Sequence, residues 1–322
     1  MKKLKVIIGV LISFVFLVLA FRKVDVREIM QEIASANFIY LILTYVVGVA
    51  GLFIRSFRWR IFMETCPRRG EIPFFRYFEA TAVGQMVNNI MPFRMGDFAQ
   101  AFFLSYRENI SRGAVFSTVV AERLTDIFPP FLVLILGSYF VFLPGQIDRG
   151  VVFLIVLPIF IFVFLFVKYQ EFFMNLSKKV IPSRGIGVHI HKFIEQLHVG
   201  LGFIRDKKRL VKVAIYTVVL WAVYALGTYF CLTAFDIRIG YPAAVLVLGI
   251  TAISVTIPSS PGYIGTWEYF ALLALSIFGI NKTLALSFAV VYHFIAWITV
   301  TSLGFVILLR SGVSLSNLEK AD

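Results

Sequence analysis

The feature that most constrains this chain is a series of long apolar runs, which recurs from Leu4 to Leu309 with little polar sequence between them. Of the 322 residues, 59% are hydrophobic and only 15% are charged. A water-soluble globular chain usually has about 45–50% apolar and about 25% charged residues. One or two soluble domains of this length could not cover so many apolar runs. The pattern therefore predicts an all-α integral membrane protein that forms a single polytopic domain over residues 1–322.

The lengths of the runs predict how often the chain crosses the membrane. A helix needs about 20 mostly apolar residues to span a bilayer, which gives about six full spans and two interrupted segments. The full spans are expected at Leu4–Phe21, Phe38–Ile54, Ala114–Leu143, Val151–Val167, Val211–Phe235 and Leu284–Leu309. The interrupted segments are Phe74–Leu104 and Tyr241–Phe278. The basic start of the first run also resembles a signal peptide, but no clean cleavage site follows, which favours an uncleaved span.

Lysine and arginine residues gather in the loops on one side of these spans. The set holds Lys2, Lys3, Lys5, Arg55, Arg58, Arg60, Arg68, Arg69, Arg76, Arg107, Arg112 and the basic residues of the 168–210 loop. Because cytoplasmic loops are enriched in these residues, we expect a multi-pass protein of the cytoplasmic (inner) membrane with both termini inside. This placement also indicates that the formal charge of +13 reflects topology and that no nucleic acid is bound.

The 168–210 loop contains apolar residues at helical spacing. They predict an amphipathic helix, which either lies on the inner leaflet or packs beneath the helix bundle. His189, His191 and His198 occur in the same loop. Their spacing fits no common ligand pattern and no cysteine is near, so no metal site is expected. The chain also lacks the phosphate-binding loop, dinucleotide-binding and metalloprotease motifs, and no cofactor is expected.

The two interrupted segments carry residues that break helices. Pro92 and Gly96 occur in the first segment. The second segment holds Pro258, Pro261, Gly262 and Gly265. Proline removes a backbone donor and glycine relaxes the backbone. We therefore expect each segment to form two half-helices that meet at a bend, rather than one continuous helix.

The predicted topology gives these two segments opposite directions. The first is entered from the cytoplasmic side after Arg76, whereas the second is entered from the outer loop that begins at Asp236. Two oppositely oriented re-entrant hairpins predict an inverted repeat, with halves at about 38–143 and 211–309, and a transporter-like site where the halves meet. Two kinked helices without shared ancestry are the alternative.

Polar side chains at membrane depth are the candidate site, because charges in a bilayer are costly and usually face a cavity or a partner. Arg94 and Arg123 are the candidate ligands of a lipid phosphate, helped by the N-termini of half-helices. The acids would neutralise these arginines when the site is empty. The residues expected to line the site are Gln85, Asn88, Asn89, Asp97, Glu122, Asp126, Ser260, Glu268 and His293.

Each of these residues also has a purely structural interpretation. Asp97 is a candidate N-cap, and Glu268 suits the first turn of its helix. Arg123 is also compatible with a purely structural ion pair to Asp97, Glu122 or Asp126. His293 could be protonation-sensitive or a partner in a helix–helix hydrogen bond. The Glu122/Asp126 pair could in principle be catalytic or bind a divalent cation, but Arg123 beside it makes either role less favourable.

Four motifs in order resemble the flippase-like domain family, the transmembrane region of lysylphosphatidylglycerol synthetases. They are Arg55-x-x-Arg58-Trp59-Arg60, Gly84-Gln85-x-x-Asn88-Asn89-x-x-Pro92-x-Arg94-x-Gly96-Asp97, Val119-Val120-x-Glu122-Arg123-x-x-Asp126, and Pro258-x-Ser260-Pro261-Gly262-x-x-Gly265-x-x-Glu268. Together they cover about residues 38–309. His293 departs from the pattern, because an arginine is expected at this place in the last span, and a second phosphate contact there is in doubt.

The resemblance implies an inner-membrane protein that moves or handles phospholipids. In the full synthetases a soluble domain follows and transfers lysine to phosphatidylglycerol. Because this chain stops at Asp322, we expect a stand-alone member without that activity. The favoured function is binding or translocation of an anionic lipid, such as phosphatidylglycerol or a polyprenyl-phosphate carrier. The alternatives are a membrane subunit that assists a separate lipid glycosyl- or aminoacyl-transferase, and a remnant phosphatidylglycerol lysyltransferase. Assembly as a homo-oligomer is a further expectation.

Overall fold

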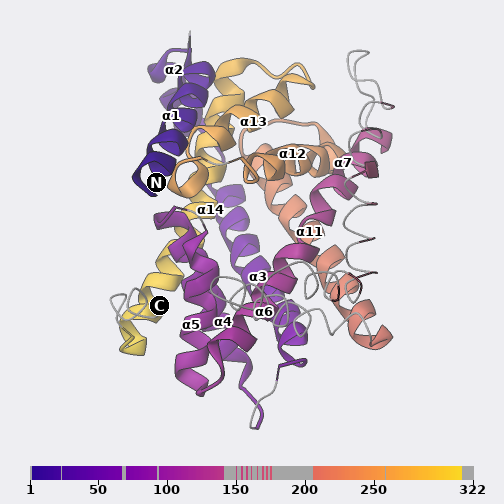
Figure 1. The fold of residues 1–322 in the computed structure, drawn as a ribbon. Helices are drawn as coiled ribbons and strands as arrows, with labels where there is room; N and C mark the ends of the chain where they lie inside the picture. Colours follow the sequence, from indigo (N-terminus) through magenta and orange to yellow (C-terminus); the bar gives the residue numbers. More distant parts are fainter. Residues whose placement is uncertain are drawn as a thin grey trace.

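The computed structural model describes residues 2–22, 24–66, 70–92, 94–140, 206–257 and 259–313, together with isolated positions between 150 and 175. Throughout these ranges the regular structure is helical (Figure 1). The prediction of an all-α membrane protein is confirmed. The span expected at Val151–Val167, the amphipathic helix within 168–210 and its three histidines lie outside the described residues.

The described helices differ widely in length. Three of them, α3, α11 and α14, are long and apolar enough to cross a membrane. At about 1.5 Å of rise per residue, even the shortest of the three, with 26 residues, exceeds the thickness of the hydrocarbon core. The elements are α1 (Lys2–Phe21), α2 (Val26–Ser35), α3 (Phe38–Met63), α4 (Phe74–Ile90), α5 (Met95–Glu108), α6 (Arg112–Thr125), α7 (Phe128–Phe140), α11 (Lys207–Ala234), α12 (Gly240–Ser254), the 3-10 turn η2 (Pro261–Tyr263), α13 (Thr266–Ser276) and α14 (Lys282–Ser311).

Contacts between helix ends show which loops share one end of the molecule. The lower end in Figure 1 collects the end of α3, the start of α4, the end of α5, the start of α11 and the end of α14. The contacts there are Arg209–Glu64 at 3.4 Å, Arg76–Glu108 at 3.2 Å and Arg107 to the Ser311 carbonyl at 3.0 Å. At the upper end, the Asn37 amide donates to the Ala234 carbonyl at 2.8 Å and Lys282 donates to the Arg22 carbonyl at 2.6 Å. The basic residues at these ends of α3, α4, α5, α11 and α14 therefore lie together, at an end that we expect to face the cytoplasm.

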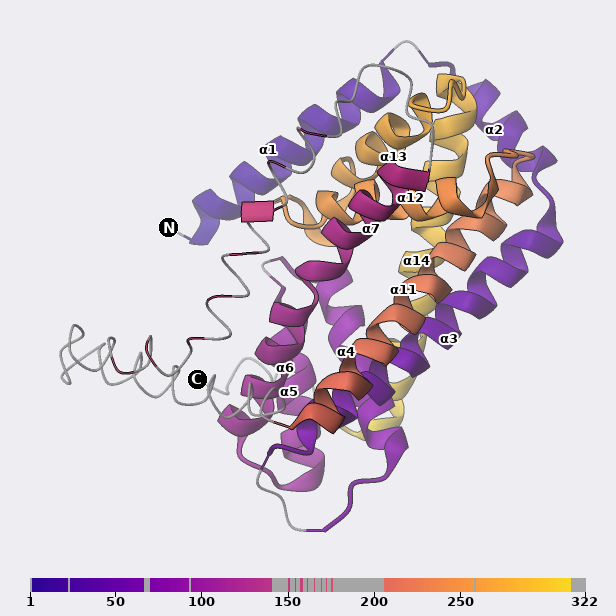
Figure 2. The ribbon, with the colours of Figure 1, turned by 90° about the vertical axis from the view of Figure 1, so that its right-hand side faces the viewer.

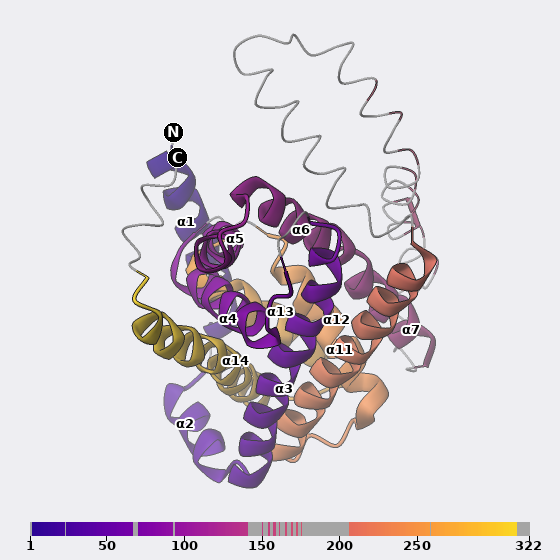
Figure 3. The same cartoon turned by 90° about the horizontal axis from the view of Figure 1, so that it is seen from below.

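The first interrupted segment forms the hairpin α4/α5 in the lower half of the molecule. Seen from below, it lies between α14 and α6 (Figure 3). The two helices approach closely because glycines face each other. A Cβ on Gly96 would collide with the Gly84 carbonyl, and a Cβ on Gly84 would lie 2.7 Å from Cβ of Gln100. Gly96 therefore belongs to α5 and permits close packing. The expectation that it relaxes the bend was wrong, since the left-handed residue at the bend is Arg94, with φ 54°.

The second interrupted segment forms the hairpin α12/α13 in the upper half (Figure 1). Its helices are separated by residues 255–265, which include η2. Gly262 and Gly265 both adopt positive φ, at 69° and 90°, a conformation that glycine adopts without steric cost. Helix α1 lies obliquely against α13 on the outside of this hairpin (Figure 2).

The tips of the two hairpins meet near the middle of the molecule. A Cβ on Gly262 would lie 3.2 Å from the Asn89 carbonyl oxygen, and Pro92 and Pro261 line the same cavity. This arrangement agrees with the sequence prediction that the two breaks approach each other.

Two predicted spans have different boundaries in the structure. Helix α3 continues past Ile54 to Met63, so Arg55 and Arg58 lie in a helix rather than in a loop. The span expected over Ala114–Leu143 is interrupted after Thr125, and α7 starts at Phe128 with two prolines in its first turn. Proline is tolerated in the first turn of a helix but not in its interior. A single continuous helix across this point was therefore the wrong prediction.

Candidate functional site

A buried cluster of arginines and carboxylates joins α3, α5 and α6. Its centre is Arg58, whose side chain is fully buried, as is that of Glu122. Arg58 donates to Glu122 Oε1 at 2.9 Å and to Asp126 at 2.5 Å. Arg55, one helical turn earlier, donates to Asp126 Oδ2 at 3.0 Å and lies 3.4 Å from Glu122 Oε1. From the sequence, both arginines were expected in a cytoplasmic loop and not in the site.

Arg123 connects this cluster to the first hairpin. Its Nε donates to Asp97 Oδ1 at 3.0 Å and its Nη1 donates to Asp126 Oδ2 at 3.0 Å. Its Nη2 is buried and has no hydrogen-bond partner among the described residues. The ion pair that sequence analysis considered for Arg123 is therefore present, and one donor is left over.

The charges of this cluster balance. Three guanidinium groups face three carboxylates, so the cluster as a whole is neutral when all six groups are ionised. Its members are Arg55, Arg58, Arg123, Asp97, Glu122 and Asp126.

Three amide side chains of α4, at Gln85, Asn88 and Asn89, face α5, α14 and the cavities. The Gly96 amide donates to Asn88 Oδ1 at 2.8 Å, and Asn88 Nδ2 donates to Asp97 at 3.3 Å. Asn89 donates to the Trp297 carbonyl at 3.2 Å and to Thr301 at 3.0 Å. The third member, Gln85, keeps a buried Nε2 without a hydrogen-bond partner among the described residues. Two of the three amides thus have structural partners, and one is left to face the cavities.

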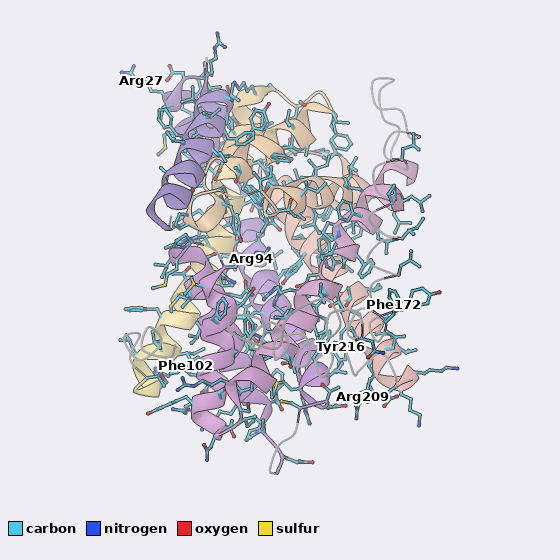
Figure 4. All side chains as sticks on the ribbon, viewed as in Figure 1. Arg27, Arg94, Phe102, Phe172, Arg209 and Tyr216 are labelled. Carbon is cyan, nitrogen blue, oxygen red and sulfur yellow. The ribbon has the colours of Figure 1, made fainter. Side chains whose placement is uncertain are left out.

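Arg94 stands apart from this network. It is the N-cap residue of α5, with an exposed side chain, and it lies near the centre of the molecule (Figure 4). No acidic side chain among the described residues forms an ion pair with it. Asp97 is the third residue of α5 and bonds Arg123 and Asn88. The suggestion that Asp97 is the N-cap was therefore wrong.

Cavities surround the hairpin tips. One of about 320 Å³ lies between them and is lined by Asn88, Pro92, Arg94, Ser260 and Pro261, among others. A second of about 280 Å³ is lined by Arg94, Arg123, Asp126, Gln85 and Tyr224, among others. A third of about 340 Å³ is lined by Arg55, Gln85, Asn89, Trp267 and His293, among others. Tyr263 and Val255 line all three, so these cavities are neighbours at one junction.

The second hairpin has its own acid. Glu268, in the first turn of α13, accepts a hydrogen bond from the amide of the N-cap residue Gly265 at 2.6 Å. Its other oxygen lies 2.5 Å from Nδ1 of His293 on α14. Ser260 has local partners, because its amide donates to Ser13 Oγ at 2.8 Å and its hydroxyl donates to the Ile264 carbonyl at 3.2 Å. Within the described ranges, no group of three histidine, cysteine or acidic side chains could hold a metal ion.

Thus the structure joins Asn88, Asp97, Glu122, Arg123 and Asp126 in one network. Arg94, Gln85 and Asn89 line the cavities beside it. The residues missed by sequence analysis, Arg55 and Arg58, had a signal in their spacing. They are three residues apart, and this spacing places both side chains on one helix face. The spacing is informative only if the helix is expected to continue past Ile54.

Comparison with known proteins shows to which family the chain belongs. The family described as "Lysylphosphatidylglycerol synthase TM region" matches residues 6–304. The chain belongs to this family. The resemblance that the four motifs indicated is thereby confirmed, and the match includes every residue of the site described above.

Relatives of similar length share this family resemblance. A "UPF0104 membrane protein" of Pyrococcus horikoshii is 27% identical, over 96% of this chain and 97% of the relative. Another of Methanocaldococcus jannaschii is 25% identical, over 93% of each chain. One of Methanothermobacter thermautotrophicus is 22% identical, over 90% of each. Their names indicate membrane proteins and specify no substrate.

Proposed function

We propose that this protein binds an anionic phospholipid or polyprenyl-phosphate lipid at the junction of the two hairpin tips and translocates it across the cytoplasmic membrane. The observation that carries this proposal is Arg94. It is a guanidinium at the middle of the molecule, it lines two cavities, and it has no acidic partner among the described residues.

The charge balance makes Arg94 a surplus cation. The neighbouring cluster is already neutral, so the charge of Arg94 is not compensated by it. An uncompensated charge at membrane depth is costly and usually marks a ligand or ion pathway. A phosphate would supply the missing negative charge, and a guanidinium can bind two phosphate oxygens at once.

The position of Arg94 at the start of a helix gives a second reason why an anion would be attracted here. The first amides of the 14-residue helix α5 follow it directly, and helix N-termini attract anions through their free N–H groups and dipole. The Gly96 amide is used for Asn88 and the Asp97 amide for the Arg94 carbonyl, so an anion would be attracted by the helix dipole, which is shared with the Asp97 carboxylate in the first turn. Asp97 is engaged with Arg123.

Arg123 supports the same site from α6. It lines the cavity that Arg94 also lines, and its buried Nη2 is a donor without a hydrogen-bond partner in the described part of the chain. A phosphate between the two arginines would use this donor while Arg123 keeps its bonds to Asp97 and Asp126. The meeting of two oppositely placed hairpins at this point is the arrangement typical of transporter sites.

The proposal is tested with a substitution at Arg94. Asparagine is the best replacement, because it tolerates the left-handed backbone better than most residues. We expect Arg94→Asn to fold with unchanged thermal stability, because no ion pair is lost. Each protein is purified in phosphatidylglycerol/phosphatidylcholine nanodiscs, and the lipid retained with it is then extracted and quantified. Arg94→Asn should retain at least tenfold less phosphatidylglycerol than the parent.

Arg60→Gln is the matched control, since Arg60 is an exposed arginine near the lower end of α3. It removes the same charge away from the cavities and should retain lipid as the parent does. Equal phosphatidylglycerol retention by folded Arg94→Asn and by Arg60→Gln would contradict the proposed role of Arg94.

A further inference from the structure

The second hairpin contains an acid–base pair that is separate from the arginine cluster. Glu268 and His293 lie 2.5 Å apart, with side chains only 9% and 13% exposed. In the first half of the chain the corresponding acid, Asp97, pairs with an arginine. Arginine does not lose its proton in proteins, whereas histidine changes charge near neutral pH. The two halves therefore place a permanent cation and a titratable base at similar positions.

His293 lies between two cavities of different character. It lines the central cavity together with Arg55 and Gln85. It also lines an outer cavity of about 350 Å³ with Glu268, and the remaining lining of that cavity is apolar. The pair thus forms part of the wall between the central junction and an apolar recess at α1 and α13.

The ionisable groups around His293 leave Glu268 as its direct partner. On the packed elements these groups are Glu268 of α13, Arg55 of α3, Tyr224 of α11, Tyr263 of η2 and Tyr292 of α14 itself. Arg55 is engaged by Asp126 and Glu122, and Tyr292 bonds Thr228. Helix α4 presents the neutral amides Gln85 and Asn89, and residues 9–21 of α1 contain no ionisable side chain.

We propose that the Glu268–His293 pair is a proton-binding site that sets the position of the second hairpin tip. When neutral His293 donates its Nδ1 proton to the Glu268 carboxylate, the pair carries one negative charge. Uptake of one proton from water at Nε2 gives an imidazolium–carboxylate pair without net charge. Release of that proton to water restores the first state, and no other reactant is needed.

The carboxylate links this charge change to the hairpin. Glu268 holds His293 with one oxygen and the Gly265 amide with the other. Gly265 is the N-cap residue of α13 at φ 90°, and its backbone lies against the Ser13 carbonyl of α1. A change in the strength of the His293 contact therefore acts on the point where the tip joins α13. That this movement accompanies lipid translocation rests on the proposed function.

Proton binding is measured without any lipid transport. The chain has four histidines, so replacing His189, His191 and His198 with glutamine leaves His293 as the sole source of an imidazole NMR signal. In detergent-purified protein we expect this signal to change as the pH is varied, because the pair binds and releases a proton. Glu268→Gln should displace the midpoint of this change, because it removes the carboxylate that contacts the imidazole. A signal that does not titrate, or a midpoint that Glu268→Gln leaves unchanged, would overturn the proton site.

The link to transport is measured separately with fluorescent phosphatidylglycerol in phosphatidylglycerol/phosphatidylcholine vesicles. The parent should respond to an imposed pH gradient. His293→Arg keeps the ion pair but cannot release its proton, so its rate should be insensitive to the gradient. A gradient response retained by folded His293→Arg would refute the coupling. Absence of transport by the parent at every pH would instead refute the proposed function, while the NMR titration still decides the proton site.

Discussion

Substitution of Arg58, at the centre of the arginine cluster, is expected to lower the free energy of unfolding strongly. The substitution Arg58→Met keeps much of the side-chain volume but removes the central charge. Asp126 would retain Arg55 and Arg123 as partners. Glu122 would keep only Arg55, at 3.4 Å, and its second oxygen already lacks a hydrogen-bond partner in the described residues. The variant therefore leaves a fully buried carboxylate without adequate compensation.

The expected size of this effect follows from the burial of both partners. Removing one partner of a buried ion pair typically costs about 3–5 kcal/mol, whereas replacing both by neutral groups is often close to neutral. We therefore expect Arg58→Met to lower the free energy of unfolding by about 3–5 kcal/mol. The double variant Arg58→Met/Glu122→Gln should lose less than the single variant, because two cations then face two carboxylates.

The assay is reversible unfolding in mixed dodecyl sulfate and maltoside micelles, followed by tryptophan fluorescence. Arg60→Met serves as the matched control on the same helix, where an exposed substitution should change stability by only about 0.5 kcal/mol. The reasoning is refuted if Arg58→Met is no less stable than Arg60→Met. It is also refuted if the double variant loses the sum of the two single losses, because the two side chains would then not interact.

Two further predictions concern packing and topology. Gly96→Ala should destabilise the protein by about 1–3 kcal/mol, because its new Cβ would collide with the Gly84 carbonyl. The control in thermal unfolding is Gly48→Ala, whose Cβ would meet Thr299 at an ordinary 3.5 Å. Equal melting temperatures of the two variants would contradict the close-packing role of Gly96. In a variant without Cys66 and Cys231, Gly200→Cys should resist a membrane-impermeant maleimide added to intact cells but react after lysis; labelling in sealed cells would show that the 168–210 loop is outside.

The hairpins were predictable because their signal is local. Pro92 and Pro261 interrupt apolar segments, and the basic residues around the first segment place its ends on one side. No long-range information was needed to expect two half-helices at each break. The same was true of the break before α7, since Pro129 and Pro130 were visible in the sequence. The span predicted over Ala114–Leu143 rested on the length of its apolar run alone.

The arginine cluster was not predictable because its cause is tertiary. Arg55 and Arg58 follow an apolar run and look like loop charges under the rule that basic residues mark cytoplasmic loops. They remain inside the protein only because Glu122 and Asp126, on α6, lie beside them. The role of Gly96 was missed for the same reason. Its requirement comes from the Gly84 backbone on the facing helix and not from its own backbone angles.

The central claim is that the junction of the hairpin tips takes an anionic headgroup and carries it across the membrane. A headgroup-resolved assay in proteoliposomes tests it most directly, with fluorescent phosphatidylglycerol and phosphatidylcholine that carry the same acyl chains. The account predicts that the parent moves phosphatidylglycerol at least tenfold faster than phosphatidylcholine and that Arg94→Asn loses this preference. Equal rates for the two lipids with the folded parent, or a preference that persists in Arg94→Asn, would contradict it.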